Sequence, residues 1–454
     1  MIIGIPDSNT KPRRCSSLDH TAVCHNADQT LYSVSHSAKE DAIATTTDSI
    51  QEASGVAVDD DGQFQAGQVA TIGLGHASHD LYPSFLAPLL PLFIANLALS
   101  KTEAGLLTLF LQGSSVVQPA LGHLADRWNL RRLVVIAPTL TALLMCAIGL
   151  APNYGILALL LVLTGISSTA FHAIAPALAG SLSGKRHLGR GMSLWMLGGE
   201  VGFAVGPLLI VTWVNWLGLK GMPWLALIGV LGSILLLVRL RDVPRTAAPS
   251  AQGVPWWRAV SQMGPVMLPL LGLIVARSFA LSALSSYLPT FLSEGGTSFW
   301  LAGASLTVYQ VAASGGVLLG GSLSDRLGRR AILLASMALS PLFLFAFLRL
   351  GGAPQIASLL GIGFGVAFFD PVVLALVQET FTQNRALASS VYLSLMFVVR
   401  SFATVAVGAV GDWLGLRWAF TASAIVFLLG APLVFWLPRA SVAGQTASES
   451  GSRP

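Results

Sequence analysis

Long apolar stretches, separated by short polar loops, make up most of the chain from about residue 68 onward. A helix needs about 20 apolar residues to cross the hydrocarbon core of a bilayer. The stretches of that kind cover residues 68–96, 102–123, 132–152, 154–182, 190–217, 222–241, 265–292, 298–322, 330–350, 354–381, 386–411 and 416–438. The pattern therefore predicts an all-α polytopic membrane protein with twelve transmembrane helices.

Composition supports this prediction and removes one alternative. Hydrophobic residues make up 54% of the 454 positions and charged residues only 10%. This composition is too apolar for an ordinary soluble protein of this length. The net charge of +5 lies in short loops between the apolar stretches, so we expect no nucleic-acid partner. The three cysteines give no disulfide framework.

The polar segments predict the domain organisation. Residues 1–66 are rich in Ser, Thr, Asp, His and Gln and have no apolar period, which predicts a disordered cytoplasmic N-terminal tail. Its stretch "CSSLDHTAVCH" (15–25) holds two cysteines and two histidines at spacings that could bind a metal ion. We interpret these residues as incidental ligands in a solvated tail. The proline-bearing segment 242–262 is predicted to be a cytoplasmic linker between two six-helix bundles, 67–241 and 263–438. Residues 439–454 are predicted to form a cytoplasmic C-terminal tail.

The distribution of basic residues predicts the orientation of the chain. Loops rich in Lys and Arg stay on the cytoplasmic side of a membrane. The loops after every second span carry Arg127, Arg131, Arg132, Lys185, Arg186, Arg190, Arg239, Arg241, Arg245, Arg258, Arg326, Arg329, Arg330 and Arg385. The loops on the other side carry only Lys101, Lys220, Arg349 and Arg417. Both termini are therefore expected in the cytoplasm.

Two loops of similar sequence reveal an internal repeat. The segments "GHLADRWNLRR" (122–132) and "GSLSDRLGRR" (321–330) each close the second span of one bundle, and Asp126 and Asp325 lie 199 residues apart. Two bundles of the same orientation form a parallel repeat about an axis normal to the membrane, with a substrate path between them. The second loop resembles the signature of the major facilitator superfamily, whereas the first departs from it at Asn129.

The resemblance implies two parallel six-helix repeats and a cytoplasmic latch between them. The latch residues would be Gly122, Asp126, Arg127, Gly321, Asp325, Arg326, Gly328, Arg329 and Arg330. An acidic side chain can sit at the N-terminus of a neighbouring helix, where the helix dipole favours negative charge. Membrane topology alone would explain the arginines but not the repeated aspartate.

A narrower resemblance points to the fosmidomycin resistance family. It rests on the segments "GHASHDLYPSFLAPLLPLF" (75–93), "GISSTAFH" (165–172), "KRHLGRGMSLWMLGGEVGFAVGPLL" (185–209) and "VQETFTQNRALASSVYLSLMF" (377–397). The resemblance implies efflux of a drug or another small molecule, coupled to the entry of protons.

Ionisable residues inside apolar spans are the candidate functional residues, because charge at membrane depth is costly and usually faces a cavity or a partner. Asp80, His172, Arg277 and Asp370 lie at similar depths in spans one, four, seven and ten. The repeat of 199 residues relates Arg277 to position 78, two residues before Asp80. It relates Asp370 to position 171, next to His172. We therefore expect Asp80 to face Arg277, and His172 to face Asp370, across the two bundles. Static polar contacts are the alternative interpretation.

A second set of candidates lies near Asp80. His76, His79 and Asp80 fall within about one helical turn, and His76 and Asp80 share a face of the helix. With an unperturbed pKa of about 6.5, histidine suits proton transfer at physiological pH. His79 is a candidate for proton coupling. A hydrogen bond to a neighbouring carbonyl is the alternative for His79 and the favoured interpretation for His76.

Spans five and eleven carry one further charge each, Glu200 and Arg400, at nearly repeat-related positions. Direct pairing between them is not assured, since each can find a partner across the two bundles. Gly198, Gly202, Gly206 and Pro207 surround Glu200 and resemble the glycine–proline motif of superfamily antiporters, although Ile210 and Val211 replace its usual glycine pair. The same small residues would also serve close helix packing.

These observations predict a monomeric secondary transporter of the plasma or bacterial inner membrane that exports a small organic molecule in exchange for protons. Arg277 would suit an anionic or phosphonate-like group. The chain has no Walker loop and no arrangement of residues that would activate a nucleophile, so we expect neither ATP-driven transport nor enzymatic activity. We also expect no cofactor or metal site in the folded part. Two alternatives stay open: a proton-symport importer, and a non-transporting receptor or assembly factor on a transporter fold.

Overall fold

The computed structural model describes residues 64–118, 121, 131–241, 263–381 and 385–437. All of them belong to one unit, Asp61–Pro454. The predicted linker, nearly all of the two predicted tails and the first predicted latch loop, with Gly122, Asp126 and Arg127, lie outside the described residues. We call residues 64–241 the N-terminal half and residues 263–437 the C-terminal half.

Helices account for nearly all of the described chain, which contains no strand. The elements of the N-terminal half are α2 (Ala66–Asp80), η1 (Pro83–Phe85), α3 (Leu86–Leu97), α4 (Lys101–Gln112), η2 (Gly113–Val117), α6 (Arg131–Ala147), η3 (Ile148–Leu150), α7 (Tyr154–Leu217), η4 (Leu219–Leu225) and α8 (Ala226–Arg239). Those of the C-terminal half are α10 (Gly264–Glu294), α11 (Phe299–Leu327), α12 (Arg329–Arg349), α13 (Gly352–Ala367), α14 (Phe369–Thr380), α15 (Arg385–Leu414), α16 (Leu416–Leu429) and η5 (Ala431–Trp436).

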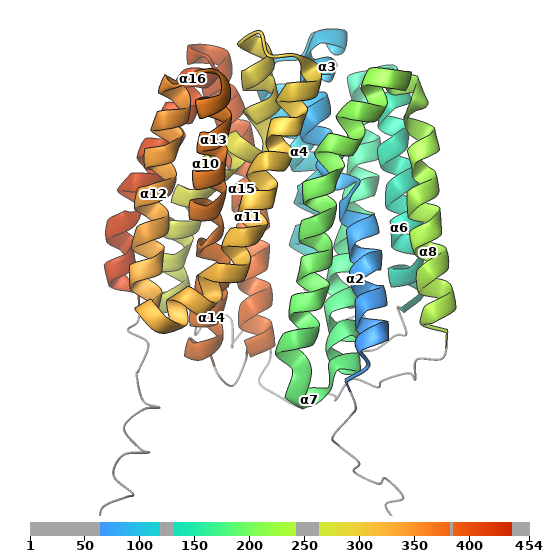
Figure 1. The fold of residues 1–454 in the computed structure, drawn as a ribbon, viewed down its shortest axis with the longest axis vertical. Helices are drawn as coiled ribbons and strands as arrows, with labels where there is room; N and C mark the ends of the chain where they lie inside the picture. The colour runs from blue at the N-terminus through green and yellow to red at the C-terminus, as the bar shows by residue number, and fades with distance from the viewer. Residues whose placement is uncertain (1–63, 119–120, 122–130, 242–262, 382–384, 438–454) are drawn as a thin grey trace, which may run out of the picture. The chain divides into compact units, whose positions relative to one another are not determined.

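Eleven stretches of the described helices are long and apolar enough to cross a membrane. They coincide with eleven of the twelve predicted spans. The remaining one, the second, corresponds to α4 and η2, and the end of that predicted span lies outside the described residues. Long α7 contains two spans, Tyr154–Ser183 and Gly191–Leu217, and Figure 1 shows it doubling back at its lower end.

Polar residues at the loop ends determine where several spans begin. Ser100 caps α4 in a capping box with Glu103, while Asn153 caps α7 and Ser298 caps α11 through side-chain hydrogen bonds to backbone N–H groups. Such caps satisfy N–H groups that have no partner inside the helix. Proline has the opposite effect within the first span, where Pro83 follows the end of α2 and removes a backbone donor.

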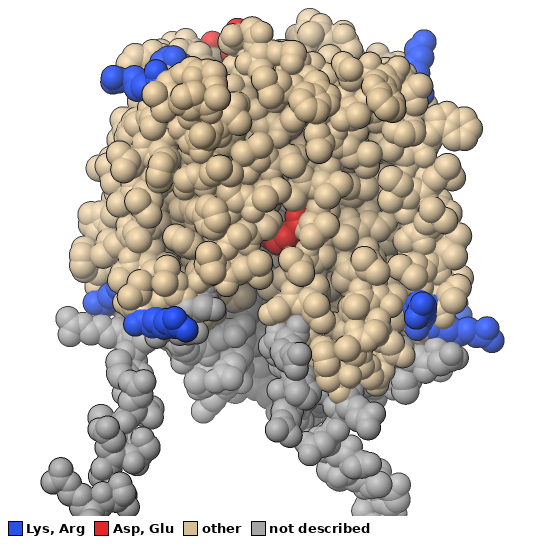
Figure 2. Space-filling model, in the orientation of Figure 1, with Lys and Arg blue, Asp and Glu red and all other residues tan. Residues whose placement is uncertain are grey.

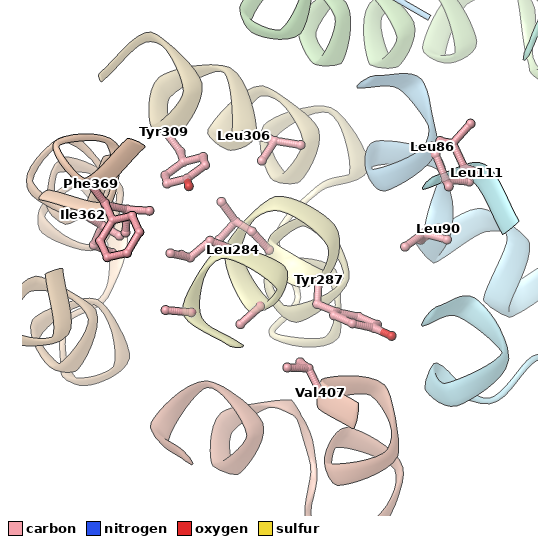
Figure 3. Packing of buried hydrophobic residues seen from close by; sticks show 14 of the residues in the cluster. Leu86, Leu90, Leu111, Leu284, Tyr287, Leu306, Tyr309, Ile362, Phe369 and Val407 are labelled. Carbon is pink, nitrogen blue, oxygen red and sulfur yellow. The ribbon is translucent and has the colours of Figure 1, made fainter. Parts of the chain in front are cut away.

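The spans form two bundles that meet along a seam (Figure 1). Contacts between α4 and α15, between α7 and α11, and between α3 and α10 join the halves. Figure 3 shows the apolar core at this junction, where Leu86, Leu90 and Leu111 of the N-terminal half lie opposite side chains of the C-terminal half, among them Leu306 and Tyr287.

The outward-facing surface has the character of a lipid contact. Large apolar side chains are exposed on many helices, for example Leu227, Leu231, Leu268, Leu342 and Leu429. Figure 2 shows Lys and Arg side chains near the two ends of the visible face and a broad band without basic residues between them. An acidic side chain interrupts this band at mid-height (Figure 2).

Candidate transport site

Four ionisable side chains meet in the N-terminal half, where α2 ends midway along the first span. Asp80 is the last residue of α2 and is buried. Its Oδ2 lies 3.0 Å from Nε2 of His76, and its Oδ1 lies 2.9 Å from Nδ1 of His79. From α7, Nε2 of His172 lies 3.4 Å from Oδ1 of Asp80. We call these four residues the histidine cluster.

Neighbouring groups hold the rings of His76 and His79 in place. His76 stacks on Trp195, with ring centroids 4.3 Å apart, and His79 stacks on Phe171 at the same separation. Nδ1 of His76 donates to the carbonyl of Trp195 at 2.8 Å, which agrees with the carbonyl contact expected for His76. Nε2 of His79 accepts from the Thr141 hydroxyl at 3.1 Å. The rings are therefore fixed before any ligand or proton arrives.

The C-terminal half contains an ion pair at the corresponding position. Nη2 of Arg277, on α10, donates to Oδ2 of Asp370, on α14. Nε of Arg277 donates to the carbonyl of Val366 at 3.3 Å, and its guanidinium lies 5.1 Å from the ring centre of Phe369. The Tyr392 hydroxyl donates to Oδ1 of Asp370 at 3.3 Å. A guanidinium keeps its charge throughout, so this pair always contains a cation.

The expected contacts of Asp80 with Arg277 and of His172 with Asp370 are wrong. Asp80 binds His172, and Arg277 binds Asp370, so each pair is completed within its own half. The repeat explains the error. Residues 199 positions apart occupy equivalent places in two bundles, and equivalence under a repeat does not bring them into contact.

A cavity of about 60 Å³ lies where the two halves meet. Both halves contribute polar atoms to its wall, with Thr108 and Gln112 on α4 and Ser285, Gln310 and Arg400 on the C-terminal side. Its lining includes Pro207 and Phe203 of α7 as well, but neither the histidine cluster nor the Arg277–Asp370 pair. Of the predicted charged site residues, only Arg400 reaches this cavity.

Arg400 lacks a carboxylate partner among the described residues. Its Nη2 donates to the Ser285 hydroxyl at 2.9 Å, and its Nε is buried without a hydrogen-bond partner. Across the cavity, Oε1 of Gln112 is also buried and unpartnered. Buried polar atoms without partners are costly, and here both belong to residues in the wall of a single cavity.

Glu200 connects the two halves beside this cavity. Its side chain projects from α7, and its Oε2 accepts from the Ser314 hydroxyl at 3.1 Å and from Nε2 of Gln310 at 3.4 Å, both on α11. The Ser314 hydroxyl also lies 2.9 Å from the carbonyl of Gln310. Because a hydroxyl carries one proton, Ser314 can donate to only one of these two acceptors at a time. Glu200 and Arg400 do not pair with each other; each bonds elsewhere.

A second contact between the halves lies at the end of the seam where α4 begins. Asp412 of α15 accepts from the backbone N–H groups of Lys101 and Thr102, at 2.7 and 2.8 Å. Nζ of Lys101 lies 3.1 Å from Oε1 of Glu294, and the Tyr287 hydroxyl donates to the carbonyl of Lys101 at 2.7 Å. We call these five residues the Lys101 seam. A carboxylate from one half thus caps a helix of the other.

Comparison with known proteins identifies the family. The model of the Major Facilitator Superfamily matches residues 72–316 and 296–454. The chain belongs to this superfamily. It is therefore a multi-pass membrane protein of a transporter family, with the all-α fold expected from its sequence.

Individual relatives agree with this membership. The chain is 26% identical over 383 residues to the fosmidomycin resistance protein of Escherichia coli, covering 81% of this chain and 92% of the relative, which confirms the resemblance to that family. It is 31% identical over 274 residues to a probable nitrate/nitrite transporter, NarK2, of Mycobacterium tuberculosis, covering 58% of this chain and 67% of the relative.

Among solved structures, a bacterial homologue of the human lysosomal transporter Spinster, in an inward-facing and occupied conformation, matches with a TM-score of 0.69 and 15% identity. That match covers 82% of this chain and 96% of the other. A D-xylose–proton symporter matches with a TM-score of 0.64 and 17% identity, covering 82% and 97%. At these identities the likeness concerns the superfamily fold alone.

The superfamily signature loop is visible here only in its second copy, and there only in part. Gly321 and Asp325 are described only as backbone positions of α11. Gly328 ends α11 at a φ of +90°, a conformation that favours glycine. Arg329 donates to Ser324, and Arg330 donates to the carbonyl of Leu437; Arg326 is exposed. These contacts stay within the C-terminal half, and the latch between the halves stays a prediction.

The glycine motif lies against the first span. A Cβ on Gly198 would lie 2.0 Å from the carbonyl oxygen of Gly73, and one on Gly202 would lie 2.5 Å from that of Ala77. A Cβ on Gly206 would lie 1.8 Å from the Ser84 hydroxyl. These three positions let α7 approach α2 and η1 more closely than any side chain would allow, which accounts for the small residues by packing.

Several site residues escaped the sequence analysis. Gln310 and Ser314 are uncharged, and only their polarity within an apolar span distinguishes them. Asp412 follows a glycine at the end of a span, where a loop residue is the ordinary interpretation. No metal site was expected in the folded part. However, His76, Asp80 and His172 each place one possible ligand atom within 4.8 Å of the other two. Their sequence separation hid this grouping.

Proposed function

We propose that the protein is a secondary transporter that exports a small organic molecule in exchange for protons, by alternating access between its two halves. The observation that carries this proposal is Glu200, an acid within the fifth span whose hydrogen bonds cross the seam beside the cavity. In this proposal the protein works as a monomer in the plasma or bacterial inner membrane, with both termini in the cytoplasm.

Glu200 serves as the proton-coupling residue. As a carboxylate it accepts a hydrogen bond from the Ser314 hydroxyl across the seam, and this bond holds α7 to α11. When Glu200 takes up a proton, its negative charge disappears. The Ser314 hydroxyl then donates its hydrogen bond to the carbonyl of Gln310, only 2.9 Å away, instead of to Glu200. The contact across the seam then weakens, and Gln310 links this change to the cavity because it lines the wall.

Arg400 serves as the substrate-binding cation. Its unpartnered Nε and the planar guanidinium suit a carboxylate or phosphonate group, which accepts two parallel hydrogen bonds. Arg277, the residue expected from sequence to fill this role, is neutralised by Asp370 and is absent from the cavity lining. A similarity to a fosmidomycin resistance protein supports testing anionic antibiotics first.

The Lys101 seam serves as the extracellular gate. Asp412, Glu294 and Tyr287 of the C-terminal half hold the start of α4 at the end predicted to face outward. Export requires these contacts to break when the cavity opens to the outside and to re-form afterwards.

Glu200→Gln tests the coupling role in proteoliposomes with a defined pH gradient and fosmidomycin as the first substrate. We expect the variant to lose gradient-driven transport and to keep substrate exchange at equal pH on both sides. Glu103→Gln is the matched control, because glutamine also satisfies the capping box at the start of α4. Gradient-driven transport by Glu200→Gln at the parental rate would remove Glu200 from the coupling mechanism.

The direction of transport is tested in the same vesicles. Export predicts that substrate moves toward the compartment from which protons flow, whereas a symporter moves both together. Absence of any flux across a panel of carboxylates and phosphonates, with intact binding, would support the receptor alternative.

A further inference from the structure

The histidine cluster has a property that proton exchange does not require: ligand atoms of three of its side chains, His76, Asp80 and His172, lie within 4.8 Å of one another. Nε2 of His76 lies 3.2 Å from Nε2 of His172. Oδ2 of Asp80 lies 3.0 Å from the first nitrogen and Oδ1 lies 3.4 Å from the second, so each nitrogen faces its own carboxylate oxygen. Two ligands bound to one tetrahedral metal ion at about 2.0–2.1 Å are separated by roughly 3.3–3.4 Å. The three separations in the cluster are close to that distance.

The outer hydrogen bonds fix which ring nitrogens face inward. Nδ1 of His76 meets the carbonyl of Trp195 at 2.8 Å, and Nδ1 of His172 meets the carbonyl of Ser168 at 2.9 Å. A carbonyl oxygen only accepts, so each Nδ1 carries a proton, and in the neutral imidazole each Nε2 then presents a lone pair to the centre. Histidines that bind metals are oriented by the same kind of outer contact.

Two lone pairs and a carboxylate facing one another call for a cation between them. Among the described residues, no Lys or Arg is paired with Asp80, whose only ion-pair partners are the three histidines. His79 donates from Nδ1 to Oδ1 of Asp80 and so orients the carboxylate without pointing at the centre. Stacking on Trp195 further restrains the His76 ring.

We propose that His76, Asp80 and His172 form a binding site for a divalent first-row transition-metal ion of the Zn²⁺ class. Two imidazoles and one carboxylate are borderline donors that suit Zn²⁺, Ni²⁺ and Co²⁺ and disfavour Mg²⁺ and Ca²⁺. With three protein ligands, the ion keeps a fourth position for water or an anionic ligand. The side chain of His172 is 23% exposed, whereas those of His76 and Asp80 are 5% and 4% exposed, so the ion enters past His172.

Such a site goes beyond the proposed exchange, since it does not involve Glu200 or Arg400. An ion held there would join α2 to the fourth span within the N-terminal half and would leave the seam untouched. Binding is therefore measurable without any transport assay, and its failure would leave the exchange proposal standing.

The experiment uses the full-length protein, purified in detergent without a histidine tag and stripped with a chelator. Titration with Zn²⁺ is expected to give one bound equivalent and to raise the melting temperature by mass action. Removing a ligand, in His76→Ala or His172→Ala, should lower Zn²⁺ affinity by more than the about 10–100-fold that loss of an outer partner costs. His79→Ala removes an outer partner and should fall within that range.

The predicted tail supplies the competing site and therefore the control. Cys15→Ser with Cys24→Ser should leave the bound equivalent unchanged; its loss in this variant would assign the metal to the tail and overturn the proposal. Retention of one equivalent by His172→Ala, or no equivalent in the parent, would overturn it as well. Where a histidine variant does not fold, the absorption spectrum of Co²⁺ bound to the parent protein decides. Ligand-field bands of a tetrahedral site without thiolate charge-transfer bands support the cluster. Thiolate charge-transfer bands refute it.

Discussion

The histidine cluster and the Arg277–Asp370 pair occupy equivalent places in the two halves but have different chemistry. In the N-terminal half an acid on the first span meets a histidine on the fourth; in the C-terminal half a cation on the first span meets an acid on the fourth. Histidine can be neutral or charged near physiological pH, whereas arginine cannot lose its proton. One half therefore holds an adjustable cluster, and the other a fixed ion pair.

The two sites also differ in their exposure. The side chain of Asp80 is 4% exposed, and that of Asp370 is 33% exposed. The more deeply buried carboxylate is the one surrounded by groups whose charge can change. A repeat thus preserves the positions of polar residues while each half adapts their chemistry separately.

The largest effect should come from breaking the fixed pair. Asp370→Asn leaves Arg277, which is buried, with a charge that it cannot lose, and we expect the free energy of unfolding to fall by about 3 kcal/mol. The measurement is the denaturation midpoint of the purified protein. The double variant with Arg277→Gln carries no stranded charge and should recover most of the loss; equal destabilisation of both variants would contradict a fixed ion pair.

A smaller effect is expected from the matching change in the N-terminal half. Asp80→Asn removes the carboxylate charge, but neutral histidines are not left with a stranded charge and the amide oxygen can still accept from His79, so we expect a loss of about 1–1.5 kcal/mol. The assay is the same and contains a chelator. A loss as large as that of Asp370→Asn would show that the cluster, too, behaves as a fixed ionic site.

The smallest effect on stability concerns the contact between halves. Asp412→Ala removes a cap worth about 1 kcal/mol from the start of α4, which favours separation of the halves at that end by roughly fivefold. Accessibility of a cysteine placed at Thr108 in the cavity wall should rise accordingly. Glu294→Gln, which removes only a partly exposed ion pair, is the control and should change accessibility much less.

The sequence predicts the fold well because its signal is repeated twelve times along the chain and does not depend on contacts. The depth of Asp80, His172, Arg277 and Asp370 follows from counting residues along helices. Their partners do not, because pairing depends on how helices pack sideways, and a repeat supplies no information on that. The polar groups at the seam, such as Ser314, were missed for a similar reason: their function arises from a residue on another helix.

Glu200 also determines the energetics of the proposed exchange. Apart from the carboxylates of the Lys101 seam, it is the only carboxylate of the described residues with a hydrogen bond across the seam, so the proposed exchange would carry one proton per cycle. One pH unit supplies about 1.4 kcal/mol per proton. A neutral substrate exchanged one for one could therefore be driven to a tenfold concentration ratio per unit of pH difference. A membrane potential of 100 mV, worth about 2.3 kcal/mol per charge, would add to this limit. An anionic substrate leaving as a proton enters moves two charges in the same electrical direction, so export of anions gains most from a polarised membrane.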